Sequence, residues 1–212
     1  ATRRPYDWVS VDSQHSAFNE EALRDFCATA TALSVTVMFR IKHTRLTFLI
    51  GNLLDLGPTG IEVPQVELET TAEEAVANFY YPPVGVRSWG GKSRLGVEGK
   101  SFDEYIAFWH DTGTLAMQIE SVAAATACKR LAKPGVDFVT FGPSDLTLNL
   151  RSYPNHALQT VDDCVRYVAT ELTDSEARVC VRVPAGDDVG RYRDMGVTMF
   201  LEFGGLPVTA AK

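Results

Sequence analysis

Two carboxylates, Glu120 and Asp145, follow two apolar segments and are the residues best placed to hold a metal ion. Glu120 closes the segment LAMQIE, and Asp145 follows VDFVTFGPS. Residues Val122–Ala132 carry small and apolar side chains at helical spacing, which predicts a strand–helix–strand unit with parallel strands. Parallel strands end at the same edge of a sheet, so the two carboxylates would meet there and offer the oxygen ligands that Mg²⁺ or Mn²⁺ prefers. The alternative is that Glu120 caps the following helix and Asp145 lies in a Pro-Ser turn.

Seven apolar segments alternate with helical patterns, which predicts an α/β fold with a parallel sheet. The expected strands are residues 9–12, 35–41, 60–64, 115–120, 136–142, 178–183 and 199–203. The expected helices include Glu20–Ala32 after an Asn19 cap, Leu46–Leu56, and one that opens with a capping box at Thr71. Several strands end in a charged residue, which is typical of the site of a (β/α)₈ barrel. No Gly-x-Gly-x-x-Gly follows the first strand, which argues against a dinucleotide-binding fold.

Arg40 interrupts the apolar strand segment VTVMFRI near its end. A guanidinium group is costly to bury unless it has an anionic partner, so one reading is that Arg40 binds an anion. The other is that its side chain reaches past the end of the strand to solvent. The residues alone favour neither reading.

The composition is that of a folded globular protein of 212 residues, with 45% hydrophobic and 22% charged residues. That length suffices for one domain with a real core or two small ones, and we expect a single domain over residues 1–212. A net charge of −7 argues against nucleic acid as the main partner, because phosphate binding needs a basic surface. No segment resembles a membrane span or a signal peptide, so we expect a cytoplasmic protein. The four cysteines are far apart, which indicates free thiols rather than disulfides or a zinc site.

Four motifs occur in an order that resembles a known family. YDWVSVDSQHS is similar to the (F/Y)DW-x-x-x-D-x-E-H segment of the metal-dependent class II pyruvate aldolases of the 4-hydroxy-2-oxoheptanedioate aldolase type. LLDLGPTGIEVPQV, YYPPVGVRSWG, and QIES followed by PGVDFVTFGPSDL resemble three further segments of that family, which also includes macrophomate synthase. The matches run from Tyr6 to about Leu148. The resemblance implies a TIM (β/α)₈ barrel of the phosphoenolpyruvate/pyruvate type.

The resemblance also implies roles for individual residues. Glu120 and Asp145 would hold Mg²⁺, or Mn²⁺ or Co²⁺ in its place, and Arg40 would contact the 2-oxo group of the substrate. His15 and Asp12 would form the acid/base pair, and Asp55 would lie near the site, often one across a subunit interface. The remaining substrate-binding residues would be Gly142, Pro143, Ser144, Gln118 and Trp89.

The implied activity is that of a carbon–carbon lyase. It would cleave a 4-hydroxy-2-oxo acid reversibly to pyruvate and an aldehyde, through a pyruvate enolate bound to the metal. One alternative is oxaloacetate decarboxylation with capture of the enolate by another electrophile, as in macrophomate synthase. Another is a non-catalytic relative that only binds 2-oxo acids. The expected partners are a small 2-oxo acid and an aldehyde, and we expect a homo-oligomer.

Three departures from the family pattern bear on these expectations. Gln14 stands where the family has a glutamate, so one negative charge near the metal is missing. The strand expected before Tyr6 and most of the helix after the last strand are absent from this sequence. The ending LEFGG also differs from the usual small residue and aspartate. We therefore expect seven barrel strands with an open edge, either because the chain is part of a longer one or because another segment replaces the missing strand.

Overall fold

Seven parallel strands form one continuous sheet in the order of the sequence. A computed structural model of the chain describes residues 6–90 and 94–204. The strands are β1 (Trp8–Asp12), β2 (Thr36–Arg40), β3 (Gly60–Val63), β4 (Thr114–Ile119), β5 (Phe138–Phe141), β6 (Arg178–Pro184) and β7 (Met199–Phe203). Each strand pairs in parallel with the next along the chain, as βα units require.

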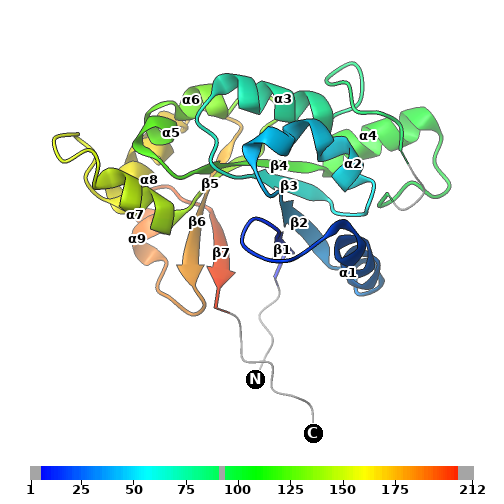
Figure 1. The fold of residues 1–212 in the computed structure, drawn as a ribbon, viewed down its shortest axis with the longest axis horizontal. Helices are drawn as coiled ribbons and strands as arrows, with labels where there is room; N and C mark the ends of the chain where they lie inside the picture. The colour runs from blue at the N-terminus through cyan, green and yellow to red at the C-terminus, as the bar shows by residue number, and fades with distance from the viewer. Residues whose placement is uncertain (1–5, 91–93, 205–212) are drawn as a thin grey trace, which may run out of the picture.

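The sheet curves into a barrel that is not closed by hydrogen bonds. Figure 1 shows β1 and β7, the two ends of the sheet, next to each other at the lower side of the molecule. No ladder joins them within the described residues, although the Tyr6 hydroxyl donates to a Glu202 carboxylate oxygen at 3.1 Å across the gap. The prediction of a TIM-type α/β barrel that lacks one strand is therefore confirmed.

Strand register determines which side chains fill the barrel. Met38, Ala116, Phe138 and Cys180 form a small interior cluster of their own, with Trp8, Met199 and Leu201 packed against it. Gly60 makes room for this layer, because a Cβ there would lie 2.9 Å from Met38 Cε and closer still to its sulfur. The barrel is thus a packed core below its mouth, and polar side chains are left to the C-terminal ends of the strands.

Helices cover the outside of the sheet (Figure 1). They are α1 (Glu20–Ala32), the 3₁₀ helix η1 (Thr44–Leu49), α2 (Ile50–Leu54), α3 (Glu69–Phe79), α4 (Phe102–Thr112), α5 (Val122–Thr126), α6 (Cys128–Leu131), α7 (Pro143–Leu150), α8 (Val161–Glu171) and α9 (Gly190–Asp194). The predicted cap of α1 is confirmed, since Asn19 Oδ1 accepts the Ala22 N–H at 2.8 Å. The predicted helix at Leu46–Leu56 is instead η1 followed by α2, and that at Val122–Ala132 is broken at Ala127 into α5 and α6.

The predicted capping box at Thr71 is wrong, because α3 begins two residues earlier. Its N-cap is Leu68, which makes no side-chain capping bond. The earlier start puts Glu69 and Glu73 one turn apart, and both accept hydrogen bonds from Lys133 Nζ, at 2.5 and 2.8 Å. A contact with a distant part of the chain thus overrides a local capping pattern.

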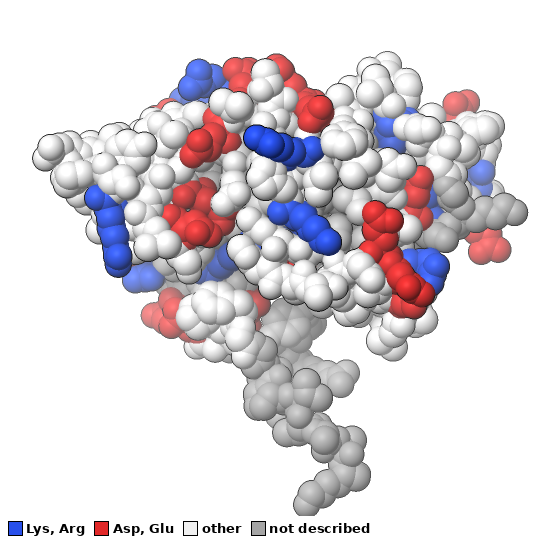
Figure 2. Space-filling view, viewed as in Figure 1, with Lys and Arg blue, Asp and Glu red and all other residues white. Residues whose placement is uncertain are grey.

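The four cysteines are free and buried, which confirms that part of the prediction. Burial raises the pKa of Cys164 to about 11 and that of Cys27 to about 12, so both remain neutral thiols at physiological pH. Figure 2 shows acidic and basic side chains interspersed over the face seen in Figure 1. None of the helices in the described ranges has the length and apolar character that a bilayer-spanning segment needs.

Candidate functional site

A cavity of about 240 Å³ lies at the C-terminal ends of the strands. It is lined by His15, Arg40, Gln118, Glu120, Gly142, Pro143, Ser144, Asp145, Arg182 and Phe203. A second hollow of about 450 Å³ shares Glu120 and Asp145 with it and is otherwise lined by Thr44, Gln65, Glu67, Ser121 and Asn149. Eight residues that the sequence singled out therefore meet in one place, although they come from five separate segments of the chain.

The Glu120 carboxylate is held in place from two sides. It directly follows β4 and is 7% exposed. Its Oε2 accepts the backbone N–H of Gln65 at 3.0 Å, and Gln65 has a φ of 50°, a left-handed conformation that a non-glycine residue adopts at a cost. On the other side lies Gly142, where a Cβ would come within 2.6 Å of Glu120 Cγ and closer still to Oε1. A strained turn and a glycine thus fix one carboxylate.

Gly142→Ala should weaken metal binding by about tenfold or more, as loss of an orienting contact to a metal ligand typically does. The added methyl group must displace the Glu120 carboxylate, because it has no free space. Titration with Mn²⁺ measures the effect. Gly190→Ala is a matched control, since its nearest neighbour would be an Asp188 carboxylate oxygen at 3.1 Å. A folded Gly142→Ala protein with wild-type Mn²⁺ affinity would contradict the assigned role.

Asp145 completes a pair of carboxylates. It lies in the first turn of α7, two residues after Pro143 opens that helix. Burial raises the pKa of Glu120 to about 7, and the charge of Asp145 adds to this rise, while the Gln65 N–H and Arg40 oppose it. Two carboxylates pressed together in this way are stabilised by a cation between them.

The donor set fits a hard divalent cation. Carboxylate oxygens are the protein ligands that Mg²⁺ and Mn²⁺ prefer, and such ions keep several positions for water or substrate. No group of three or more His, Cys, Asp or Glu side chains gathers into a ready-made metal cage within the described ranges. Glu120 and Asp145 would therefore supply two ligands and leave the other positions open.

Arg40 has an anionic partner, which decides between the two readings of its position. It is 6% exposed, and its Nε and Nη2 donate to the two Asp12 carboxylate oxygens at 2.8 and 2.5 Å. Its Nη1 donates to Gln118 Oε1 at 3.3 Å. Because Asp12 and Arg40 are register partners on β1 and β2, the sheet itself brings them together. The guanidinium is thus fixed at the cavity wall and does not reach out to solvent.

Asp12 and His15 do not touch through their side chains within the described residues. Asp12 is engaged with Arg40 and also accepts the Gln14 N–H at 2.9 Å. Burial raises the pKa of Asp12, but the hydrogen bonds and charge of Arg40, with the N–H groups of Gln14 and His15, more than offset it and leave the pKa below its usual value. His15 lines the cavity from the loop after β1. In this arrangement Asp12 orients Arg40, and His15 stands as a separate group.

Two predicted residues, Asp55 and Trp89, do not line the cavity. Asp55 Oδ1 accepts a hydrogen bond from Arg87 Nη2 at 3.0 Å. Trp89 stacks on Phe102 with ring centroids 4.3 Å apart and lies under the Arg94 guanidinium. A role for Asp55 across a subunit interface stays a prediction.

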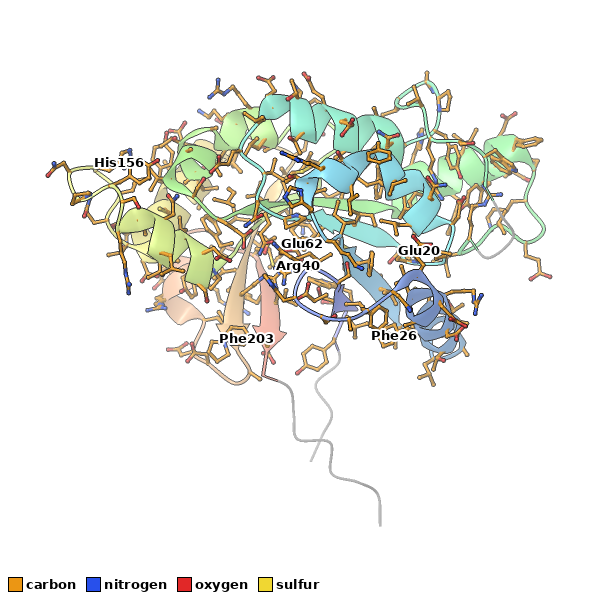
Figure 3. All side chains as sticks on the ribbon, in the orientation of Figure 1. Glu20, Phe26, Arg40, Glu62, His156 and Phe203 are labelled. Carbon is orange, nitrogen blue, oxygen red and sulfur yellow. The ribbon has the colours of Figure 1, made fainter. Side chains whose placement is uncertain are left out.

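The sequence analysis missed three residues at the barrel mouth. Gln65 acts through its backbone, which its residue type does not reveal. Glu62 on β3 and Arg182 on β6 form an ion pair inside the barrel. Each is a charged residue within an apolar strand, the same feature that singled out Arg40, so this pattern could have identified both. Figure 3 shows Glu62 beside Arg40 in the middle of the molecule, whereas His156 lies far out on the loop before α8.

Comparisons with known proteins agree with this geometry. A family model described as HpcH/HpaI aldolase/citrate lyase matches residues 1–172. A hydroxypyruvate/pyruvate aldolase from Delftia acidovorans is 31% identical over 193 residues, which are 90% of this chain and 71% of the relative. The solved structure of an HpcH/HpaI aldolase from Desulfitobacterium hafniense DCB-2 has a TM-score of 0.82 at 26% identity, covering 92% of this chain and 76% of that one. Macrophomate synthase shares the fold, with a TM-score of 0.77 at 24% identity over 92% of this chain and 69% of its own.

Proposed function

Because the chain belongs to the HpcH/HpaI aldolase/citrate lyase family, we propose that it is a divalent-metal-dependent carbon–carbon lyase. Its reaction would be the reversible cleavage of a 4-hydroxy-2-oxo acid to pyruvate and an aldehyde. The observation that carries this proposal is the meeting of Glu120, Asp145 and Arg40 in one cavity. Two carboxylates facing a fixed guanidinium suit a substrate whose carbonyl oxygen gains negative charge during the reaction.

Glu120 and Asp145 would hold Mg²⁺, Mn²⁺ or Co²⁺, which acts as a Lewis acid on a 2-oxo acid. Arg40 would donate to the 2-oxo oxygen with N–H groups that Asp12 and Gln118 leave unused. Because Arg40 carries five N–H groups and commits three of them, two remain for the substrate. The backbone of Gly142–Ser144, at the start of α7, would receive the substrate carboxylate.

His15 is the group in the cavity that can move a proton at neutral pH. In cleavage, its imidazole would take the proton of the 4-hydroxyl group as the C3–C4 bond breaks. The bonding electron pair passes to C3 and forms the enolate, which becomes pyruvate when C3 receives a proton. The aldehyde leaves with the former 4-hydroxyl oxygen as its carbonyl oxygen.

Oxaloacetate decarboxylation is the second candidate, because the same residues would stabilise the same enolate. The aldolase name of the Delftia relative favours aldol cleavage as the first. A purely binding role is disfavoured, since His15 and the Arg40–Asp12 pair would serve no purpose in holding a 2-oxo acid alone. The homo-oligomeric state, the single-domain organisation and the cytoplasmic location stay predictions.

Metal removal tests the proposal directly. The purified protein should release pyruvate from 4-hydroxy-2-oxo acids or oxaloacetate with Mg²⁺, Mn²⁺ or Co²⁺, and EDTA should lower the rate by at least about 100-fold. Excess Mn²⁺ should restore it, and the preferred substrate would distinguish aldolase from decarboxylase. Full activity in EDTA would contradict the metal dependence. A folded, metal-loaded protein that releases no pyruvate from any of these substrates would leave only a binding role.

A further inference from the structure

Arg182 is a second guanidinium on the wall of the same cavity. It lies on β6 two residues after Cys180, whose side chain fills the barrel interior, so Arg182 points to the interior as well. Its side chain is 16% exposed, and it lines the cavity together with Glu120, Asp145 and Arg40. The proposed reaction gives it no task, because Arg40 already serves the 2-oxo oxygen.

The interior around Arg182 supplies only one hydrogen-bond partner. Its Nη2 donates to Glu62 Oε1 on β3, across the barrel, and Glu62 is 2% exposed. Its Nε is buried, and no described residue accepts from it. A guanidinium has five N–H donors, and a buried one is stable when most of them are used. Arg182 therefore has far more unused donor capacity than Arg40, which commits three N–H groups where Arg182 commits one.

The charge balance of the pair fits an anion receptor. Glu62 neutralises Arg182 when no ligand is present, which allows the guanidinium to stay in the barrel. One guanidinium can serve two carboxylates, because its N–H groups form more than one donor edge. A carboxylate entering the cavity could thus bind the unused edge of Arg182 without breaking the bond to Glu62.

We propose that Arg182 binds a second carboxylate, one carried by the aldehyde half of the substrate. The enzyme would then prefer 4-hydroxy-2-oxo acids that release an acidic aldehyde. This inference rests on the proposed function, since the first carboxylate is taken to be that of the 2-oxo acid. The competing explanation is that Glu62 and Arg182 merely brace β3 against β6.

The test compares two aldehydes in the addition to pyruvate. They are 4-oxobutanoate, which is acidic, and pentanal, which is neutral and of similar length. Two methylene groups separate the carboxylate of 4-oxobutanoate from its aldehyde, so it cannot chelate a metal through both. The readout is the ratio of kcat/KM for the acid to that for the neutral aldehyde. Wild type should favour the acid, and Arg182→Gln should lower the ratio by about 10- to 100-fold, the size of a lost hydrogen bond to a charged group.

Glu62→Gln is the matched control, because it removes the other charge of the pair and retains an amide oxygen. An unneutralised Arg182 attracts anions more strongly, so this variant should keep the acid/neutral ratio or raise it. A bracing pair would affect both aldehydes alike in both variants and leave the ratio unchanged. If Arg182→Gln does not fold, the double variant with Gln at both positions removes both charges and should lose the acid preference.

Hydrogen–deuterium exchange at the methyl group of pyruvate, measured in D₂O with Mn²⁺, separates the two levels of the argument. The exchange needs enolate formation but no aldehyde. Exchange in wild type with an unchanged acid/neutral ratio in Arg182→Gln would overturn the inference alone. No exchange and no pyruvate release in wild type would overturn the proposed function and this inference with it.

Discussion

Glu120→Gln is expected to lower metal-dependent pyruvate release by about 1,000-fold, because charge stabilisation by a bound divalent ion is worth several kcal/mol and each 1.36 kcal/mol is tenfold in rate. The amide has nearly the shape of the carboxylate, and its oxygen can still accept the Gln65 N–H. The variant therefore removes one negative charge and a metal ligand with little change in packing. Asp145→Asn should have an effect of the same order.

Glu67→Gln provides a matched control for Glu120→Gln. Glu67 is an exposed carboxylate that lines the neighbouring hollow and is not part of the pair. Its loss should change the rate by less than a factor of about 3, as an exposed charge contributes little. Pyruvate release and Mn²⁺ titration should be measured on each variant. Wild-type Mn²⁺ affinity in both Glu120→Gln and Asp145→Asn would show that the metal is held elsewhere.

The same substitution should have an opposite effect on metal-free stability. Burial raises the pKa of Glu120 from 4.5 to about 7, so the folded state favours the protonated carboxyl group. Such a group stabilises the fold at low pH, and this contribution is lost as the pH rises through about 7. In EDTA, the Tm of wild type should therefore fall between about pH 5 and pH 8 relative to that of Glu120→Gln. Parallel Tm curves would show that Glu120 is not strained in the empty site.

The convergence of Glu120 and Asp145 could be predicted because it needs only parallel strands and a crossover helix. Parallel β strands end on one side, so the order of elements along the chain already places the two residues at one edge. The pairing of Asp12 with Arg40 is different. It depends on register between β1 and β2, which becomes known only when the neighbouring strands are.

Features that depend on the backbone could not be predicted in the same way. The Gln65 N–H reaches Glu120 because the chain turns left-handed after Pro64, and no side-chain pattern encodes that turn. The Arg182–Glu62 pair joins residues 120 positions apart, and each alone looks like an isolated charge in a strand. Sequence patterns therefore predicted which ends of the strands carry the site, while the contacts that orient its groups required the fold.

Arg40→Lys is expected to lower kcat by about 100-fold with a smaller change in KM, the loss that follows removal of a preorganised donor to a developing oxyanion. Lysine keeps the positive charge, but its single ammonium group cannot grip both Asp12 oxygens and also reach Gln118. The donor would therefore be misplaced exactly where the reacting oxygen gains charge. Arg24→Lys is the control, because Arg24 pairs with Asp25 in an exposed ion pair on α1.

Arg40→Met separates the structural part of this role from the chemical part. Without the guanidinium, Asp12 keeps the burial that raises its pKa and loses the hydrogen bonds and charge that lower it, so its pKa should rise. A lowered pKa in the folded state gives stability that is present above the unfolded value and lost as the pH falls through the folded value. The variant should thus be less stable than wild type at pH 7, and the difference should shrink towards pH 3. Equal destabilisation at both pH values, together with wild-type kcat in Arg40→Lys, would mean that Arg40 supports the barrel mouth by packing and not through its charge.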